Sequence, residues 1–121
     1  MASSKKETGR RGELLAAEFL KSRGYRIIEA NFRTPRGELD IIARKEDYLV
    51  FVEVRTRHGA TLGTPEESVT PRKKAKLVAL AQAYLESHPA PEQPWRIDVV
   101  AVELGPGSAS RVRLIENAVT Q

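Results

Sequence analysis

Apolar side chains near the start of the chain follow a helical spacing that then gives way to a strand. Along residues 8–23 they recur at the intervals of one helix face, at Leu14, Leu15, Ala17, Phe19 and Leu20. This spacing predicts an amphipathic helix, and Gly24 is a typical C-terminal stop. Residues 25–32, YRIIEANF, favour a short strand. Thr34-Pro35-Arg36-Gly37 then has the composition of a turn.

Two apolar runs follow and predict a β-hairpin. They cover residues 39–43 and 48–54, and the polar segment Arg44-Lys45-Glu46-Asp47 separates them. Because strand side chains alternate between faces, one face of this hairpin is wholly aliphatic and must be buried. Its members are Leu39, Ile41, Ala43, Val50, Val52 and Val54.

The burial of that face fixes how the two strands pair, because a shift of one residue would turn one strand over. With Glu46-Asp47 as a two-residue turn, Ile41 lies opposite Val52 and Asp40 lies opposite Glu53. Directly opposed Cβ atoms are roughly 5 Å apart. The pattern therefore predicts two neighbouring carboxylates, with Arg55 just beyond Glu53 on the same face.

The second half of the chain predicts one more helix and two more strands. Residues 58–69 form a glycine-containing loop long enough to suggest a function. Thr70-Pro71 has the composition of an N-cap and first helical residue, opening a helix through Leu85. After a proline-rich connector at residues 88–94, strands are predicted at 96–104 and 112–115, and the apolar run 98–102 indicates a strand buried on both faces. The expected class is α/β, a mixed β-sheet flanked by helices in the order αβββαββ.

Composition narrows the class of protein. The chain has 121 residues, which fits a single domain over 1–121 with residues 1–7 as a flexible basic arm. It has no Cys and only two His, so any metal must be bound by oxygen ligands. No apolar run approaches the roughly 20 residues of a membrane span, and the N-terminus lacks the apolar core of a signal peptide. We therefore expect a cytoplasmic protein without a membrane partner.

The charge is unevenly distributed. The net charge is +4, and the excess lies in the first two thirds: residues 1–40 carry nine basic against six acidic residues, 41–80 eight against five, and 81–121 three against five. A solvated surface and a polyanion-binding surface explain this about equally well. The cluster Arg72-Lys73-Lys74 is less ordinary, because it occupies a predicted helix start, where the helix dipole disfavours cations.

The predicted carboxylate pair needs compensation by a proton, a cation or a metal ion. From the residues alone, a structural ion-pair cluster with Arg55 or Arg36 is the first interpretation. The alternative is a hard divalent cation, Mg²⁺ or Mn²⁺, which favours carboxylate, carbonyl and water oxygens.

GELDIIA (residues 37–43) followed by LVFVEVRTR (49–57) resembles the signature of the YraN-like family, an uncharacterised bacterial family whose members are regarded as endonucleases. That family is similar to Holliday junction resolvases within the restriction-endonuclease-like, PD-(D/E)xK superfamily. The likeness covers nearly the whole chain. It includes Gly9, Glu13, Ala17, Leu20 and Gly24-Tyr25, Gly63 and Pro65, Lys73, Leu77 and Tyr84-Leu85, and residues 98–102 and 116–118.

The resemblance implies a role for each residue of the motif. It makes Asp40 the metal-binding aspartate and Glu53 the second acid, with the carbonyl of Val54 as a further ligand. Glu13 would complete the metal site or orient water; without the family, a carboxylate that complements the helix dipole is the simpler interpretation. Glu18 and Glu38 are alternatives to Glu13 that we rank lower.

The sequence departs from the superfamily pattern at Arg55, where most relatives have lysine. Arginine stays protonated and cannot act as a general base, although it can bind a phosphate. The implied activity is a Mg²⁺- or Mn²⁺-dependent hydrolysis of phosphodiester bonds in DNA, including branched DNA, by a homodimer. Arg36, Arg57, Arg72, Lys73 and Lys74 would contact the DNA backbone without reading its sequence. The alternatives are a binding module on the same fold that does not cut, and a purely structural domain.

Overall fold

The computed structural model describes residues 5–58, 65–89, 92–106 and 110–119. Its elements follow the predicted order, with one additional 3₁₀ helix. They are α1 (Lys5–Ser22), β1 (Arg26–Thr34), β2 (Gly37–Lys45), β3 (Tyr48–His58), the 3₁₀ helix η1 (Pro65–Ser68), α2 (Pro71–Ser87), β4 (Trp95–Leu104) and β5 (Ser110–Ile115). Helix α1 begins at Lys5, three residues earlier than expected, and residues 1–4 of the predicted arm lie outside the described residues. Parts of the predicted loop at 58–69 and of the predicted connector at 88–94 also lie outside them, as do residues 107–109.

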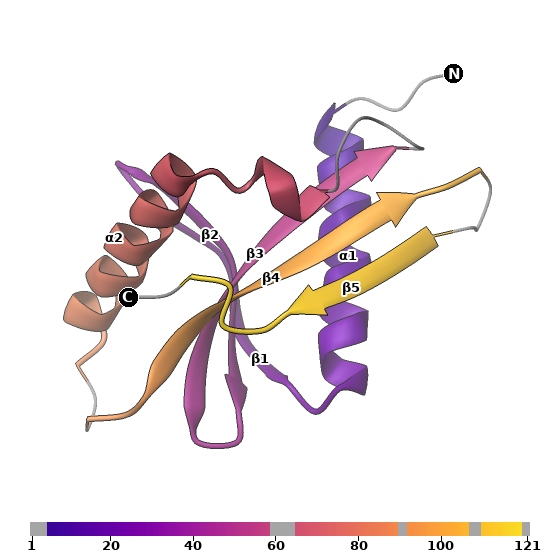
Figure 1. The fold of residues 1–121 in the computed structure, drawn as a ribbon. Helices are drawn as coiled ribbons and strands as arrows, with labels where there is room; N and C mark the ends of the chain where they lie inside the picture. Colours follow the sequence, from indigo (N-terminus) through magenta and orange to yellow (C-terminus); the bar gives the residue numbers. More distant parts are fainter. Residues whose placement is uncertain (1–4, 59–64, 90–91, 107–109, 120–121) are drawn as a thin grey trace.

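The five strands form one mixed sheet in the order β1-β2-β3-β4-β5 (Figure 1). Strands β3 and β4 pair in parallel, and the other neighbours are antiparallel. The parallel pair is possible because η1 and α2 connect its two strands. This arrangement confirms the predicted α/β class and is consistent with a restriction-endonuclease-like sheet.

The two helices cover opposite faces of the sheet and divide the core in two (Figure 1). On the α1 face, Leu20 packs with Val50, Val52 and Val100. On the α2 face, Leu77 and Leu80 pack with Phe51 and Val99. Strand β4 contributes to both clusters, which confirms the prediction from its apolar run. None of the helices in the described part of the chain is long and apolar enough to span a bilayer.

Helix α2 begins where the sequence predicts. The Thr70 hydroxyl accepts a hydrogen bond from the backbone N–H of Lys73 at 3.2 Å, and Pro71 is the first helical residue. Such a cap satisfies one of the free N–H groups of the first turn. This start fixes the orientation of the basic residues that follow.

Strand β3 runs four residues beyond its predicted end, to His58. The reason is its parallel ladder with β4, which continues from Leu49↔Trp95 to His58↔Leu104. The extension confirms that Arg55 lies on the strand two residues beyond Glu53, and it adds Arg57 to the sheet. The apolar run that predicted this strand ended at Val54, so the sequence did not show how far the strand continues.

The prediction for Leu39 was wrong. It packs on the α2 face with Ile42 and Phe51, not with Ile41 on the α1 face. The alternation of β2 breaks at Asp40, where the paired register of β2 and β3 ends at Ile41↔Val52. A break in regular pairing allows two successive side chains to leave the two-residue period.

A buried charge cluster at the start of β4 was not predicted. Asp98 is fully buried and accepts hydrogen bonds from the Tyr25 hydroxyl at 2.8 Å, Arg96 Nε at 3.0 Å and the backbone N–H of Asn117 at 2.8 Å. These bonds join residues from three separate parts of the chain. A buried carboxylate that is fully paired in this way stabilises a fold.

Candidate active site

The hairpin of β2 and β3 opens at Asp40. Its register matches the prediction, with Ile41 opposite Val52 and Lys45 opposite Tyr48 across a two-residue turn. Beyond Ile41, Asp40 makes a side-chain contact instead: its Oδ2 accepts a hydrogen bond from the backbone N–H of Val54 at 2.8 Å. The carboxyl of Glu53 lies close enough to raise the pKa of Asp40. The two carboxyls therefore come together as predicted, through an opening of the hairpin rather than as a regular cross-strand pair.

Asp40 is held in an environment that favours its protonated form. Burial, followed by the charge and the hydrogen bond of Glu53 and the charge of Glu13, raises the pKa of Asp40 to about 8. The N–H of Val54 acts in the opposite direction but does not offset these effects. Near neutral pH the pair thus has a proton that a divalent cation can replace.

Glu53 is buried, with 3% of its surface exposed, and it faces two basic side chains. Its Oε2 lies 3.5 Å from Arg55 Nη1 and 3.2 Å from Lys73 Nζ. Arg55 is also bound to η1, because its Nε donates to Ser68 Oγ at 2.8 Å. The sequence anticipated the contact with Arg55 but not the one with Lys73, which joins α2 to β3.

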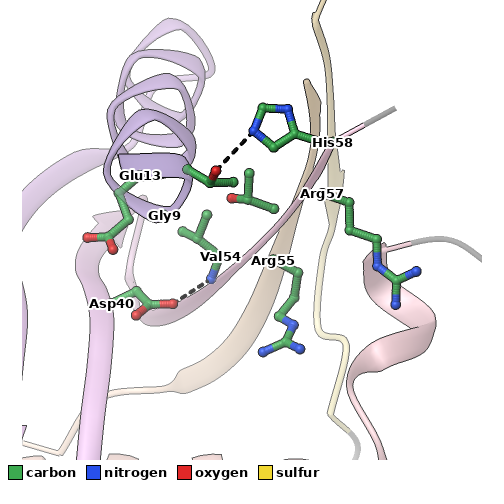
Figure 2. Close-up of a pocket in the computed structure, with 9 residues that line it drawn as sticks. Gly9, Glu13, Asp40, Val54, Arg55, Arg57 and His58 are labelled. Atoms are coloured by element: carbon green, nitrogen blue, oxygen red, sulfur yellow. Dashed lines mark hydrogen bonds between the residues drawn. The ribbon is translucent and has the colours of Figure 1, made fainter. Parts of the chain in front are cut away.

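Helix α1 brings a third carboxylate to the opening of the hairpin. The helix approaches β3 closely at Gly12, where an added Cβ would lie 1.8 Å from Thr56 Oγ1. The next residue, Glu13, extends from the helix toward Asp40 (Figure 2). Burial, with the charges of Glu38 and Glu53, raises the pKa of Glu13. Close packing at Gly12 therefore positions Glu13 near the pair.

The two alternatives to Glu13 lie in different places. Glu18 is exposed and pairs with Lys21 at 3.7 Å, so it is away from the opening. Glu38 is next to Glu13, and Asn31 bridges the two. When its amide nitrogen faces these carboxylates, Asn31 donates to Glu13 Oε1 at 3.0 Å and to Glu38 Oε1 at 2.6 Å. Asn31 has a φ of 56°, a conformation that Asn tolerates better than most residues. No signal in the sequence identified it.

A cavity of about 550 Å³ lies over Asp40, between α1 and β3 (Figure 2). Its lining consists of Thr8, Gly9, Glu13, Asp40, Val54, Arg55, Thr56, Arg57 and His58. At its rim, Thr8 Oγ1 and His58 Nε2 are hydrogen-bonded at 2.9 Å. The cavity has carboxylates at one end and basic side chains along β3, a distribution that suits a metal ion and a phosphate group.

The side chains at the opening fit a hard divalent cation only if other oxygens take part. Among the described residues, no three His, Asp or Glu side chains are arranged to hold a metal ion. Mg²⁺ typically uses one or two carboxylates and completes its shell with water and substrate oxygens. Asp40 and Glu53 supply two carboxyls of that type, and relief of their mutual repulsion favours a cation there.

The other basic residues expected to contact DNA lie in the cavity, in the first turn of α2 and in the turn between β1 and β2. Arg57 lines the cavity. Arg72 and Lys74 are exposed in the first turn of α2, and Arg36 is exposed in the turn between β1 and β2. That turn lies against α2, since a Cβ on Gly37 would be 2.9 Å from Lys76 Cε.

Comparisons with known proteins give a consistent family. The model of the uncharacterised protein family UPF0102 matches residues 12–102. A UPF0102 protein of Dehalococcoides mccartyi is 51% identical over 119 residues, covering 98% of both chains. Another, from Symbiobacterium thermophilum, is 50% identical over 113 residues, covering 93% of this chain and 96% of the relative. A third, from Roseiflexus castenholzii, is 50% identical over 105 residues, covering 81% and 85%.

Proposed function

This chain belongs to the uncharacterised protein family UPF0102, and we propose that it is a Mg²⁺- or Mn²⁺-dependent endonuclease that hydrolyses phosphodiester bonds in DNA. One observation carries the proposal: the carboxyls of Asp40 and Glu53 share the opening of the hairpin, beside a cavity with basic side chains. Repulsion between these groups costs stability. Such an arrangement is typical of functional sites.

Asp40 and Glu53 would hold the cation, with the carbonyl of Val54 as a further ligand. The bound ion would polarise the scissile phosphate and lower the pKa of a water molecule. Glu13, with its raised pKa, would orient that water through a hydrogen bond. Arg55, held by Glu53 and Ser68, would keep positive charge next to the phosphate.

The surrounding basic residues would hold DNA by its backbone. Arg57 would act within the cavity, and Arg36, Arg72, Lys73 and Lys74 along the edge formed by α2 and the β1–β2 turn. Contacts with phosphates position the substrate without reading bases, so we expect weak sequence preference and a steep loss of affinity with salt. On a branched substrate two cuts need two sites, which favours a homodimer. We expect this dimer to act in the cytoplasm.

The test is cleavage of labelled linear, flapped and four-way DNA with Mg²⁺, Mn²⁺ or EDTA. Asp40→Asn and Glu53→Gln should each lower the rate by at least about 10³-fold. Glu18→Gln is the matched control, because Glu18 is an exposed carboxylate on the same helix as Glu13. Cleavage that persists in EDTA, or in both site variants, would contradict the proposal.

A second candidate is a DNA-binding module that does not cut. Arg55 favours it, because the superfamily has lysine at this position and the Arg55–Glu53 ion pair also serves a structural role. Salt-sensitive DNA binding by the wild type without cleavage in either metal would support this alternative. Arg55→Lys separates the two further: a gain of cleavage would mean that arginine had suppressed an otherwise complete site.

A further inference from the structure

Two cations contact the same oxygen of Glu53, and they are held differently. Arg55 is attached at two points of its side chain, through Nη1 to Glu53 and through Nε to Ser68. Lys73 reaches Glu53 Oε2 from the first turn of α2, at 3.2 Å. An ammonium group on a flexible stem can change partners more readily than a guanidinium bound at both ends.

The first turn of α2 places Lys73, but not its neighbours Arg72 and Lys74, in contact with Glu53. Thr70 caps the helix by accepting the N–H of Lys73, and Pro71 fixes the first helical turn. The side chains of Arg72 and Lys74 consequently point to solvent, whereas that of Lys73 is 30% exposed and touches the buried Glu53. The helix dipole disfavours a cation in this first turn, so Lys73 gains from a nearby anion.

We propose that Lys73 is a further catalytic cation of this site and contacts the scissile phosphate directly, while Arg55, held by Glu53 and Ser68, keeps positive charge beside it. This inference rests on the proposed nuclease function. In the free protein Lys73 neutralises Glu53. A cation held by Glu53 would take over the neutralisation of this oxygen, and the ammonium of Lys73 would then be available to a non-bridging oxygen of the phosphate.

The reaction balances without a proton transfer by Lys73. A water molecule forms a new P–O bond and releases its proton to solvent. The P–O bond to the leaving oxygen breaks with its electron pair, and the leaving oxygen takes a proton from solvent. Throughout, the ammonium of Lys73 offsets the negative charge on the phosphoryl oxygens.

The experiment compares Lys73→Met with Lys73→Arg and with Lys21→Met in the full chain. Lys21 is a suitable control because it pairs with Glu18 on the surface of α1, away from the site. With four-way DNA and Mn²⁺, Lys73→Met should lower kcat by about 100-fold while KM changes much less. Lys73→Arg should restore most of the loss, and Lys21→Met should match the wild type.

A second readout uses Mn²⁺ alone, in calorimetry without DNA. Loss of the cation at Glu53 should tighten Mn²⁺ binding by about 2- to 5-fold in Lys73→Met, with no change in Lys21→Met. A merely structural ion pair would instead weaken Mn²⁺ binding as the site loosened, and thermal unfolding of each variant checks for this.

The outcomes separate the two proposals. If the wild type cuts and Lys73→Met cuts with the same kcat, the role of Lys73 is wrong and the nuclease proposal stands. If Lys73→Met binds Mn²⁺ no more tightly than the wild type, the competition at Glu53 is also wrong. If the wild type cuts none of the substrates in either metal, the proposed function fails and takes the catalytic role of Lys73 with it.

Discussion

The two aspartates of the sheet interior, Asp98 and Asp40, are treated in opposite ways. Asp98 accepts hydrogen bonds from Tyr25, Arg96 and the backbone of Asn117, and it is fully buried. Asp40 accepts one bond from the N–H of Val54 and otherwise meets a second carboxyl, which helps to raise its pKa to about 8. The first is built for stability, and the second costs stability at neutral pH.

The contrast offers a physical criterion for separating structure from function in this fold. A buried charge with a complete set of donors needs no ligand. A carboxyl next to another carboxyl lowers the stability of the folded protein, and a cation that binds there restores it. Each of the following changes tests one side of this comparison.

The largest expected effect on the free energy of unfolding is at Asp98. Asp98→Asn should lower the free energy of unfolding by about 4 kcal/mol, because it leaves the largely buried guanidinium of Arg96 without its counter-charge. Urea unfolding at pH 7 measures the change. Glu103→Gln is the control, since it removes a partly exposed ion pair with Arg113 and should cost less than about 1 kcal/mol. An equal, small loss in both variants would mean that the Asp98 cluster is not a stabilising one.

Asp40→Asn should stabilise the protein, whereas Asp98→Asn should destabilise it. Without divalent metal at pH 8, it should raise the free energy of unfolding by about 2 kcal/mol. Asparagine can still accept the N–H of Val54, and it no longer repels Glu53. The same urea experiment in EDTA gives the value, and a destabilised Asp40→Asn would contradict the difference between the two aspartates.

The pH dependence of stability should follow from the same group. The pKa of Asp40 is raised from 3.8 when unfolded to about 8 when folded, so the folded state binds the proton more tightly. The contribution of this proton to the free energy of unfolding is complete below about pH 4 and is lost as the pH rises to about 8. The slope is at most about 1.4 kcal/mol per pH unit. Unfolding in EDTA across this range should show a fall in the free energy of unfolding that flattens in Asp40→Asn. The fall in the wild type should diminish when Mn²⁺ replaces EDTA. A wild-type curve identical to that of the variant would rule out this titration.

The smallest effect concerns Glu13. Because its pKa is raised by burial and by Glu38 and Glu53, Glu13→Gln should stabilise the protein at pH 8 by less than about 1 kcal/mol. Cleavage should nevertheless fall by about 10- to 100-fold, because the change alters the group that we propose to orient the attacking water. Glu18→Gln should change neither quantity. Equal cleavage by the two variants would remove Glu13 from the site.

The sequence predicted those features that depend on local periodicity. The aliphatic face of the hairpin set its register, Glu46-Asp47 set its turn, and Thr70-Pro71 set the start of α2. It did not predict the reversal of Leu39, which accompanies the end of regular β2–β3 pairing at Ile41, or the positive φ of Asn31, which leaves no trace in the hydrophobic pattern. The contact of Lys73 with Glu53 was also missed, since it depends on how α2 packs across β3. The roles of the site residues remain predictions.

Calorimetry with Mn²⁺ on the wild type, Asp40→Asn and Glu53→Gln tests the central claim most directly. If the two carboxyls bind one divalent ion, the wild type will bind Mn²⁺ at pH 7 with release of close to one proton, measured in buffers of different ionisation enthalpy, and both variants will lose the binding. Absence of binding by the wild type, or binding that survives in both variants, would contradict the claim.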